Sequence, residues 1–276
     1  MKKKFYALLL GACVMTESCM FGFEVPKEER EYNGKSYLLT FYDDFSSNKL
    51  DTRKWAKCPE WERQTHLQNH GWWSNECSYV KDGNLIIEGK KKDGKLLSGG
   101  VRTKGKFEQA FGLYEIKFKI EKTSGLWNAF WLMTEKEQIV GNGAVDGGEI
   151  DIFEVLPNDT NQPAGKRTYI NSALHWDGYG KDHKSKGSSI VIDDSFFDEW
   201  HTILFEWTED SYKAFLDGEE YWSVTGDEAE AWGGIVTSKN YIKITSEFGR
   251  WAGPLDESAL PSKMYVDYIK VYKQMK

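Results

Sequence analysis

The chain has 276 residues, of which 15% are aromatic and 40% hydrophobic, so it can bury a substantial core and is not a disordered chain. Its length fits one all-β domain. The net charge of −7, with no run of basic residues beyond the N-terminus, argues against nucleic acid as a partner. After the first two dozen residues, no apolar run approaches the roughly 20 residues that cross a bilayer.

The N-terminal segment has the layout of a secretory signal, because three lysines precede a short apolar stretch. We therefore treat residues 1–24 as a leader and short tether and assign 25–276 to a single domain. The stretch Leu10-Gly11-Ala12-Cys13 also resembles a bacterial lipobox, in which the cysteine is lipidated after cleavage. Cleavage elsewhere in the leader is the alternative. Either route predicts an exported protein that is secreted, periplasmic or anchored at the cell surface.

From residue 37 onward, short runs rich in aromatic and branched residues alternate with turn dipeptides. The Asp-Gly pairs at 82–83, 93–94 and 217–218 each lie between such runs and indicate β-hairpins. The clearest strand is 113–122, in which apolar and charged residues alternate. Further strands are predicted at 37–45, 84–91, 126–134, 148–156, 168–176, 201–209, 212–222, 240–248 and 264–273. Helical signal is confined to a turn or two at 227–232.

Many strands at this spacing without intervening helices favour a two-sheet antiparallel sandwich or jelly roll, with a barrel as the minor alternative. No repeat or linker divides residues 36–274. The polar stretches 158–165 and 178–189 are predicted to be surface loops, and Trp200 and Trp207 are assigned to the core.

Only two cysteines, Cys58 and Cys77, lie clearly in the body of the chain. An oxidising compartment would permit a disulfide between them. A buried reduced pair is equally consistent, because the sequence does not show whether their β-carbons face each other. Neither has a metal-ligand spacing and the five histidines are scattered, so a zinc site is not predicted.

Three acids, Glu149, Asp151 and Glu154, lie within six residues of a strand-like run. On a regular strand, Glu149 and Asp151 share a face and Glu154 points to the other. One extra residue in a β-bulge, at Ile152 or Phe153, would return Glu154 to the face of the other two. We therefore predict a row of three carboxyl groups on one face of the sheet.

Such a row suits glycoside hydrolysis with retention of configuration. That reaction needs one carboxylate to attack the anomeric carbon and one carboxylic acid to protonate the leaving oxygen, about 5–5.5 Å away. Repulsion between the acids keeps at least one proton on the cluster near neutral pH. A solvated acidic face and a site for a hard cation such as calcium are the alternatives. Trp127 and Trp131 favour hydrolysis, because flat aromatic faces suit sugar rings.

The sequence resembles glycoside hydrolase family 16. The run from Glu149 to Glu154 matches the family's bulged Glu-x-Asp-x-x-Glu motif. Supporting stretches follow in the family's order at Asn75 with 79–85, then 100–106, 125–132, 200–207, 216–218 and 264–272. The resemblance implies a concanavalin A-like jelly roll with a concave substrate cleft and a retaining, endo-acting hydrolase. It implies Glu149 as the nucleophile, Glu154 as the general acid and base, and Asp151 as the assisting residue.

The resemblance also implies a set of substrate-binding residues in the cleft. These are Asn75, Arg102, Trp127, Trp131, His175, Glu247 and Trp251. The stretch 246–251 departs from the Gly-Gly-x-Trp form that is common in the family, which leaves the exact substrate open.

The expected substrate is a β-1,3-glucan or a mixed-linkage β-1,3/1,4-glucan. The negative net charge and the lack of an arginine-rich run near the catalytic strand favour neutral glucan over sulfated galactan. One alternative is a red-algal galactan hydrolase such as an agarase or carrageenase. The alternative from another class is a non-catalytic polysaccharide-binding module on the same fold.

No cofactor or metal is expected to take part in catalysis. Relatives in the family carry a structural calcium on the convex side, and no acid cluster in this sequence identifies its ligands. The polysaccharide is the expected partner of a monomer. Contact with a membrane is expected only through a lipid on Cys13.

Overall fold

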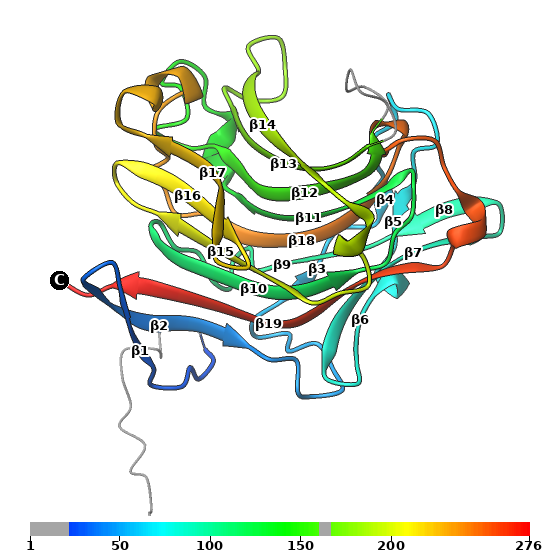
Figure 1. The fold of residues 1–276 in the computed structure, drawn as a ribbon, viewed down its shortest axis with the longest axis horizontal. Coiled ribbons are helices and arrows are strands. Elements are labelled where there is room, and N and C mark those ends of the chain that lie inside the picture. The colour runs from blue at the N-terminus through cyan, green and yellow to red at the C-terminus, as the bar shows by residue number, and fades with distance from the viewer. Residues whose placement is uncertain (1–21, 160–166) are drawn as a thin grey trace, which may run out of the picture.

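The computed structural model describes residues 22–159 and 167–276. The described residues form two packed β-sheets with short 3-10 turns between strands, as Figure 1 shows. Predictions on the leader, on Cys13 and on most of the 158–165 loop concern residues outside these ranges. No helix in the two ranges is long and apolar enough to span a bilayer.

The smaller sheet has seven strands and carries the concave face. In spatial order they are β14 (Lys184–Ile192), β13 (Arg167–Trp176), β12 (Glu149–Asp159), β11 (Leu126–Met133), β18 (Tyr241–Phe248), β9 (Gly100–Arg102) and β3 (Ala56–Lys57). All six of its ladders are antiparallel.

The larger sheet packs behind the smaller one. Its main path is β17 (Glu219–Thr225), β16 (Ser211–Leu216), β15 (His201–Trp207), β10 (Gly112–Ile120), β19 (Ser262–Gln274), β7 (Asn84–Lys92), β8 (Lys95–Ser98), β5 (Trp72–Trp73) and β4 (Trp61–Glu62). Off this path, β2 (Lys35–Asp43) pairs with β19, β1 (Glu29–Tyr32) with β2, and β6 (Ser78–Lys81) with β7. The predicted antiparallel jelly-roll sandwich is confirmed.

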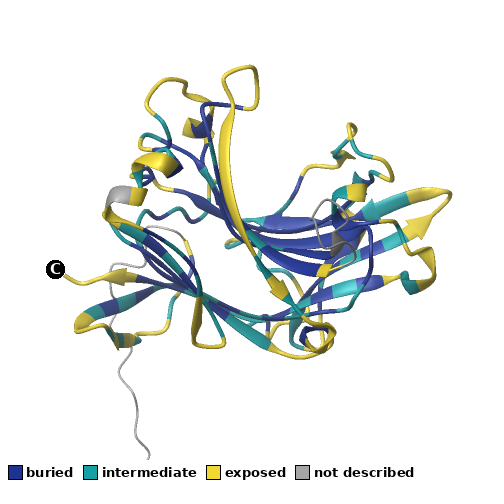
Figure 2. Ribbon diagram, turned by 45° about the horizontal axis from the view of Figure 1, so that its top comes forward, coloured by how far each residue is buried: buried dark blue, intermediate teal, exposed yellow. Residues whose placement is uncertain are grey.

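The core lies between the sheets, where Figure 2 shows the central strands as buried. The predicted alternation in β10 holds: Ile116, Phe118 and Ile120 are fully buried. Phe118 stacks on Phe153 of the smaller sheet with ring centroids 4.6 Å apart. Buried aromatic side chains contribute strongly to the stability of a core, so this contact holds the two sheets together behind β12.

All three predicted Asp-Gly hairpins are confirmed. Both residues of each pair have positive φ, as two-residue hairpin loops require. The turn at 217–218 divides the predicted strand 212–222 into β16 and β17. An Asn-Gly pair at 33–34 makes a fourth such turn, between β1 and β2.

Two expectations were wrong, one about a loop and one about the burial of a tryptophan. Residues 178–189 are not all loop, because β14 begins at Lys184 and pairs with β13 along its whole length. Its residues 184–189 are polar or small and exposed at the sheet edge, so they show no apolar alternation. Ile190 and Ile192 at its end pack against the core. Trp200 is 40% exposed, with Lys117 and Lys119 over its ring, whereas Trp207 is buried as predicted.

The remaining short segments are 3-10 turns. They are η2 (Asn75–Cys77), η3 (Glu135–Gln138), η4 (Asp194–Phe196), η5 (Gly226–Glu228), η6 (Glu230–Trp232), η7 (Arg250–Ala252) and η8 (Glu257–Ala259). The weak helical signal at 227–232 thus corresponds to η5 and η6. Cys58 and Cys77 are both buried free thiols, which selects the reduced pair of the two alternatives.

Candidate active site

The predicted bulge is present in β12. On β11, Phe130 pairs with Phe153 and the next residue, Trp131, pairs with Asp151, so Ile152 is the extra residue. The carbonyl of Ile152 accepts hydrogen bonds from Ser172 Oγ and from Tyr221 Oη, each at 2.7 Å. These donors satisfy a carbonyl group that the interrupted ladder leaves without a backbone partner.

The bulge places the three acids on the concave face, where all three line a cavity of about 920 Å³. Small side chains lie beside them: Ala129 is directly opposite Glu154, and Ala173 is directly opposite Asp151. A larger residue at either position would fill the space over the carboxyl groups. The register of β11, β12 and β13 therefore opens a trough along the acid row.

Glu149 is held by the segment that follows β13. The hydroxyl of Tyr179 donates a hydrogen bond to Glu149 Oε2. Burial and the neighbouring charge of Asp151 raise the pKa of Glu149 to about 7. This carboxyl group is therefore partly protonated at neutral pH in the free protein.

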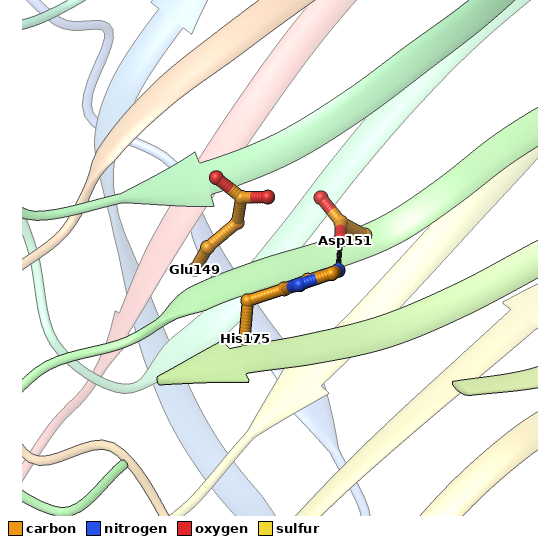
Figure 3. Close-up of side chains that lie close together, drawn as sticks. All are labelled: Glu149, Asp151 and His175. Carbon is orange, nitrogen blue, oxygen red and sulfur yellow. Dashed lines mark ion pairs between the residues drawn. The ribbon is translucent and has the colours of Figure 1, made fainter. Parts of the chain in front are cut away.

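Asp151 faces His175, which lies opposite Glu149 on β13, as Figure 3 shows. His175 Nε2 is 3.3 Å from Asp151 Oδ2, and Nδ1 is 3.0 Å from Nε2 of His183. Burial opposes the charge on His175, but the hydrogen bond to Asp151 and the charges of the acids outweigh it and raise its pKa to about 9. The pKa of His183 is lowered by burial and by the charge of His175, so a neutral His183 accepts from the imidazolium.

Glu154 accepts a hydrogen bond from Asn171 Nδ2 at 3.0 Å. Ser189 on β14 donates in turn to Asn171 Oδ1, which fixes the orientation of the amide. Burial and the charge of Asp151 raise the pKa of Glu154 well above its ordinary value. Because Glu149 and Glu154 are both shifted upward, the acid row retains a proton near neutral pH.

The same cluster has the donor set of a cation site. One ligand atom each from Glu149, Asp151 and His175 lies within 4.8 Å of the others. Ligation would require His175 to lose its proton, because a metal binds the neutral imidazole. The pKa of His175 is raised by the acids, so a cation would have to displace that proton.

Six of the seven predicted substrate-binding residues line the cavity. They are Arg102, Trp127, Trp131, His175, Glu247 and Trp251. Trp127 meets Trp251 edge to face with ring centroids 5.3 Å apart. Glu247 accepts hydrogen bonds from Arg63 at 2.9 Å and from Gln64 at 2.8 Å.

Asn75 is the one predicted binding residue that does not line the cavity. Asn75 is exposed in η2 and does not line the cavity. Its backbone N–H donates to Glu60 Oε1 at 2.8 Å, and its carbonyl accepts from Lys57 Nζ at 2.6 Å. These contacts fix the backbone of the turn.

Sequence reasoning missed Tyr179, His183, Lys243 and Arg63 as cleft residues. Alternation in the predicted strand 240–248 would have placed Lys243 on the face of Glu247. Tyr179 and His183 carried no such signal, because they lie in a segment without strand periodicity.

A jelly roll with a bulged acid strand lining a long concave cleft is the architecture of a polysaccharide-acting hydrolase class. The model of the glycosyl hydrolases family 16 matches residues 64–270, and the chain belongs to this family.

Relatives and solved structures agree with that assignment. The chain is 25% identical to the beta-glucanase of Rhodothermus marinus, over 93% of this chain and 92% of that protein. It is 24% identical to glucan endo-1,3-beta-glucosidase A1 of Niallia circulans over 86% of this chain, but spans only 38% of that protein's length. The endo-beta-1,3-glucanase structure from Pyrococcus furiosus superposes with a TM-score of 0.72 at 26% identity, covering 91% of this chain and 100% of that one.

Proposed function

We propose that this protein is a retaining, endo-acting glycoside hydrolase that cleaves β-1,3-glucan, mixed-linkage β-1,3/1,4-glucan or both. The observation that carries the proposal is the bulge at Ile152, which gathers Glu149, Asp151 and Glu154 on the wall of one cleft. The relatives named as glucan endo-1,3-beta-glucosidase and endo-1,3-1,4-beta-glycanase support the substrate class. They favour glucan over the galactan alternative.

In the proposed first half-reaction, Glu149 attacks the anomeric carbon as a carboxylate while Glu154 gives its proton to the leaving oxygen. The raised pKa values support this division, because the pair holds one proton near neutral pH. The hydrogen bond from Asn171 orients Glu154 for the transfer.

In the second half-reaction, Glu154 accepts a proton from the attacking water. Once Glu149 is esterified it carries no charge, so the pKa of Glu154 falls and it becomes a base. Asp151 assists as the charged neighbour of both, held by the His175 imidazolium at 3.3 Å.

The test is reducing-sugar release with product sizing on laminarin, barley mixed-linkage glucan, agarose and κ-carrageenan. We expect internal cleavage of the glucans, with the newly formed reducing end in the β configuration by NMR. Glu149→Gln should abolish turnover and retain oligosaccharide binding. Binding without turnover in the unaltered protein would support the binding-module alternative, and cleavage of a galactan alone would replace the glucan assignment.

We propose that activity needs no metal. Treatment with a chelator tests this against the alternative that Glu149, Asp151 and His175 bind a cation. Unchanged rates after exhaustive treatment with EDTA are expected. Loss of activity that calcium or zinc restores would assign the Glu149, Asp151 and His175 group to a metal.

We also propose that the protein is exported as a monomer, with Cys13 as a lipidation site. The basic start and short apolar stretch of residues 1–12 support export, and the lipobox-like Leu10 to Cys13 supports the anchor. Fractionation of cells that express the full chain and Cys13→Ser tests this. The proposal expects the unaltered chain in the membrane fraction and the variant outside it.

A further inference from the structure

Two cations that lie side by side in the cleft form no salt bridge with a described residue. Lys243 on β18 and Arg102 on β9 are direct cross-strand neighbours, and both line the cavity. Neither forms a hydrogen bond or an ion pair with any residue in the described ranges, and Arg102 Nε is buried without an acceptor. Lys243 is only 9% exposed.

Two neighbouring cations, in contrast, are paired with acids. Arg63 pairs with Glu247 at 2.9 Å, and Lys104 pairs with Glu135 at 2.6 Å. The nearby Cys58 is no counter-ion, because burial raises the pKa of its thiol. Along the same cross-strand row, Trp131 lies between Lys243 and Asp151. Lys243 and Arg102 therefore form a pocket wall of two basic groups without a direct acidic contact. Burial lowers the pKa of Lys243 to about 8, against the opposing effect of the charges of Glu149 and Glu247.

This arrangement is unfavourable in the free protein. Like charges directly opposite each other on adjacent strands repel, and burial of an ammonium group is costly. Ring faces offset part of the cost: Lys243 Nζ lies 3.5 Å from the ring centroid of Trp131 and 5.0 Å from that of Trp73. The charges of Glu149 and Glu247 offset a further part. An anion in the cleft would relieve both penalties.

The position of Lys243 also changes how Trp131 can act. The ammonium group lies 3.5 Å from the ring centroid and so covers one face of the indole. A sugar unit beside that face meets a charged hydrogen-bond donor rather than an open aromatic surface.

We propose that Lys243 and Arg102 form a subsite for an oxyanion substituent, a carboxylate or a sulfate, carried by a sugar unit of the polysaccharide. The inference rests on the proposed function, because it assigns the substituent to a substrate of the same cleft. The guanidinium can bind such a group through two parallel N–H donors, and the ammonium adds a third charged donor. Within the proposed glucan class, the preferred substrate then carries such a substituent on some of its sugar units.

The test compares three forms of one glucan: neutral laminarin, laminarin oxidised at C6 to the carboxylate, and sulfated laminarin. The ratio of kcat/KM on each anionic form to that on the neutral form is measured for the unaltered protein, Lys243→Met and Arg102→Met. We expect a ratio of roughly ten or more for one anionic form, because charge-assisted hydrogen bonds are the strong ones. In both variants the ratio falls toward one. The preferred form identifies carboxylate or sulfate.

Lys186→Met is the matched control. Lys186 lines the same cavity from β14 and lies over the ring of Trp232, so this variant removes one charge from the cleft outside the proposed subsite. Its ratio should equal that of the unaltered protein. An equal fall in all three variants, or no preference for either anionic form, would overturn the subsite while leaving glucan hydrolysis intact.

Calorimetry separates binding from turnover and from misfolding. The Glu149→Gln protein, with and without Lys243→Met, is titrated with neutral and anionic laminari-oligosaccharides after equal melting temperatures are verified. Tighter binding of an anionic oligosaccharide that disappears with Lys243→Met supports the subsite, and equal binding of both forms contradicts it. If the unaltered protein cleaves no glucan, the proposed function fails and this titration alone decides the subsite.

Discussion

At the scale of single residues, the site depends on donors that set the charge of the acids. The hydroxyl of Tyr179 donates to Glu149, and this hydrogen bond lowers a pKa that burial has raised. Tyr179→Phe removes one oxygen and leaves the half-exposed ring in place. We expect kcat/KM to fall roughly tenfold or more, as for loss of one donor to a charged reacting group.

The pH profile distinguishes this role from a packing role. Because the hydrogen bond stabilises the carboxylate, its loss raises the pKa of Glu149, and the acidic limb of kcat/KM moves to higher pH. Tyr241→Phe is the control, since Tyr241 lines the cavity but contacts Glu135 rather than the acid row. An unshifted limb in Tyr179→Phe would contradict the interpretation.

His175 predicts how stability depends on pH. Its folded pKa of about 9 lies above the ordinary value near 6.5, so the charged form is favoured by folding. Its contribution is therefore complete below about pH 6.5 and is lost as pH rises through about 9. His175→Gln should be destabilised relative to the unaltered protein at pH 6, and the difference should shrink by pH 10. Urea denaturation at both pH values measures this difference in the free energy of unfolding. The same difference at both pH values would show that protonation of His175 is not coupled to folding.

At the scale of the elements, the bulge in β12 positions Glu154, and its stability rests on Ser172 and Tyr221. Ser172→Ala leaves the buried carbonyl of Ile152 with one donor, and we expect a loss of about 1 kcal/mol in the free energy of unfolding. A several-fold loss of kcat should accompany it, because Glu154 lies two residues beyond the bulged position. Ser188→Ala changes the exposed cross-strand neighbour on β14 and should alter neither quantity. Equal stability and kcat in both variants would show that the bulge does not need this donor.

The elements also show what sequence can and cannot predict. The bulge and the shared face of the three acids could be predicted, because side chains alternate along a strand and one extra residue brings Glu154 back to the face of Glu149 and Asp151. Strand β14 could not, because residues 184–189 of this edge strand are exposed and polar or small, so they show no apolar alternation. The position of Tyr179 in the cleft could not be predicted from the sequence either. It depends on the buried carboxylate of Asp177, which accepts from the Gly141 amide at 3.0 Å and from Lys184 at 2.8 Å, and such an anchor has no local sequence signature.

At the scale of the whole molecule, the concave sheet keeps its shape because the larger sheet packs behind it. Phe118 and Phe153 make the central contact, stacked at 4.6 Å and fully buried. Phe153 also directly follows the bulged Ile152, whereas Phe118 belongs to the sheet that carries none of the three acids of the site. The two rings therefore share one packing interface, but only Phe153 lies on the strand that carries the three acids.

This difference predicts an asymmetry between two matched substitutions. Phe118→Leu and Phe153→Leu remove similar buried area, and each should lower the free energy of unfolding by about 1–3 kcal/mol. At a temperature where both variants are fully folded, Phe153→Leu should lose kcat because the bulge shifts with its side chain, while Phe118→Leu should retain most of it. Denaturation curves and steady-state kinetics on the same preparations measure both effects. Equal losses of kcat would mean that the packing between the sheets, rather than the local bulge, sets the positions of the acids.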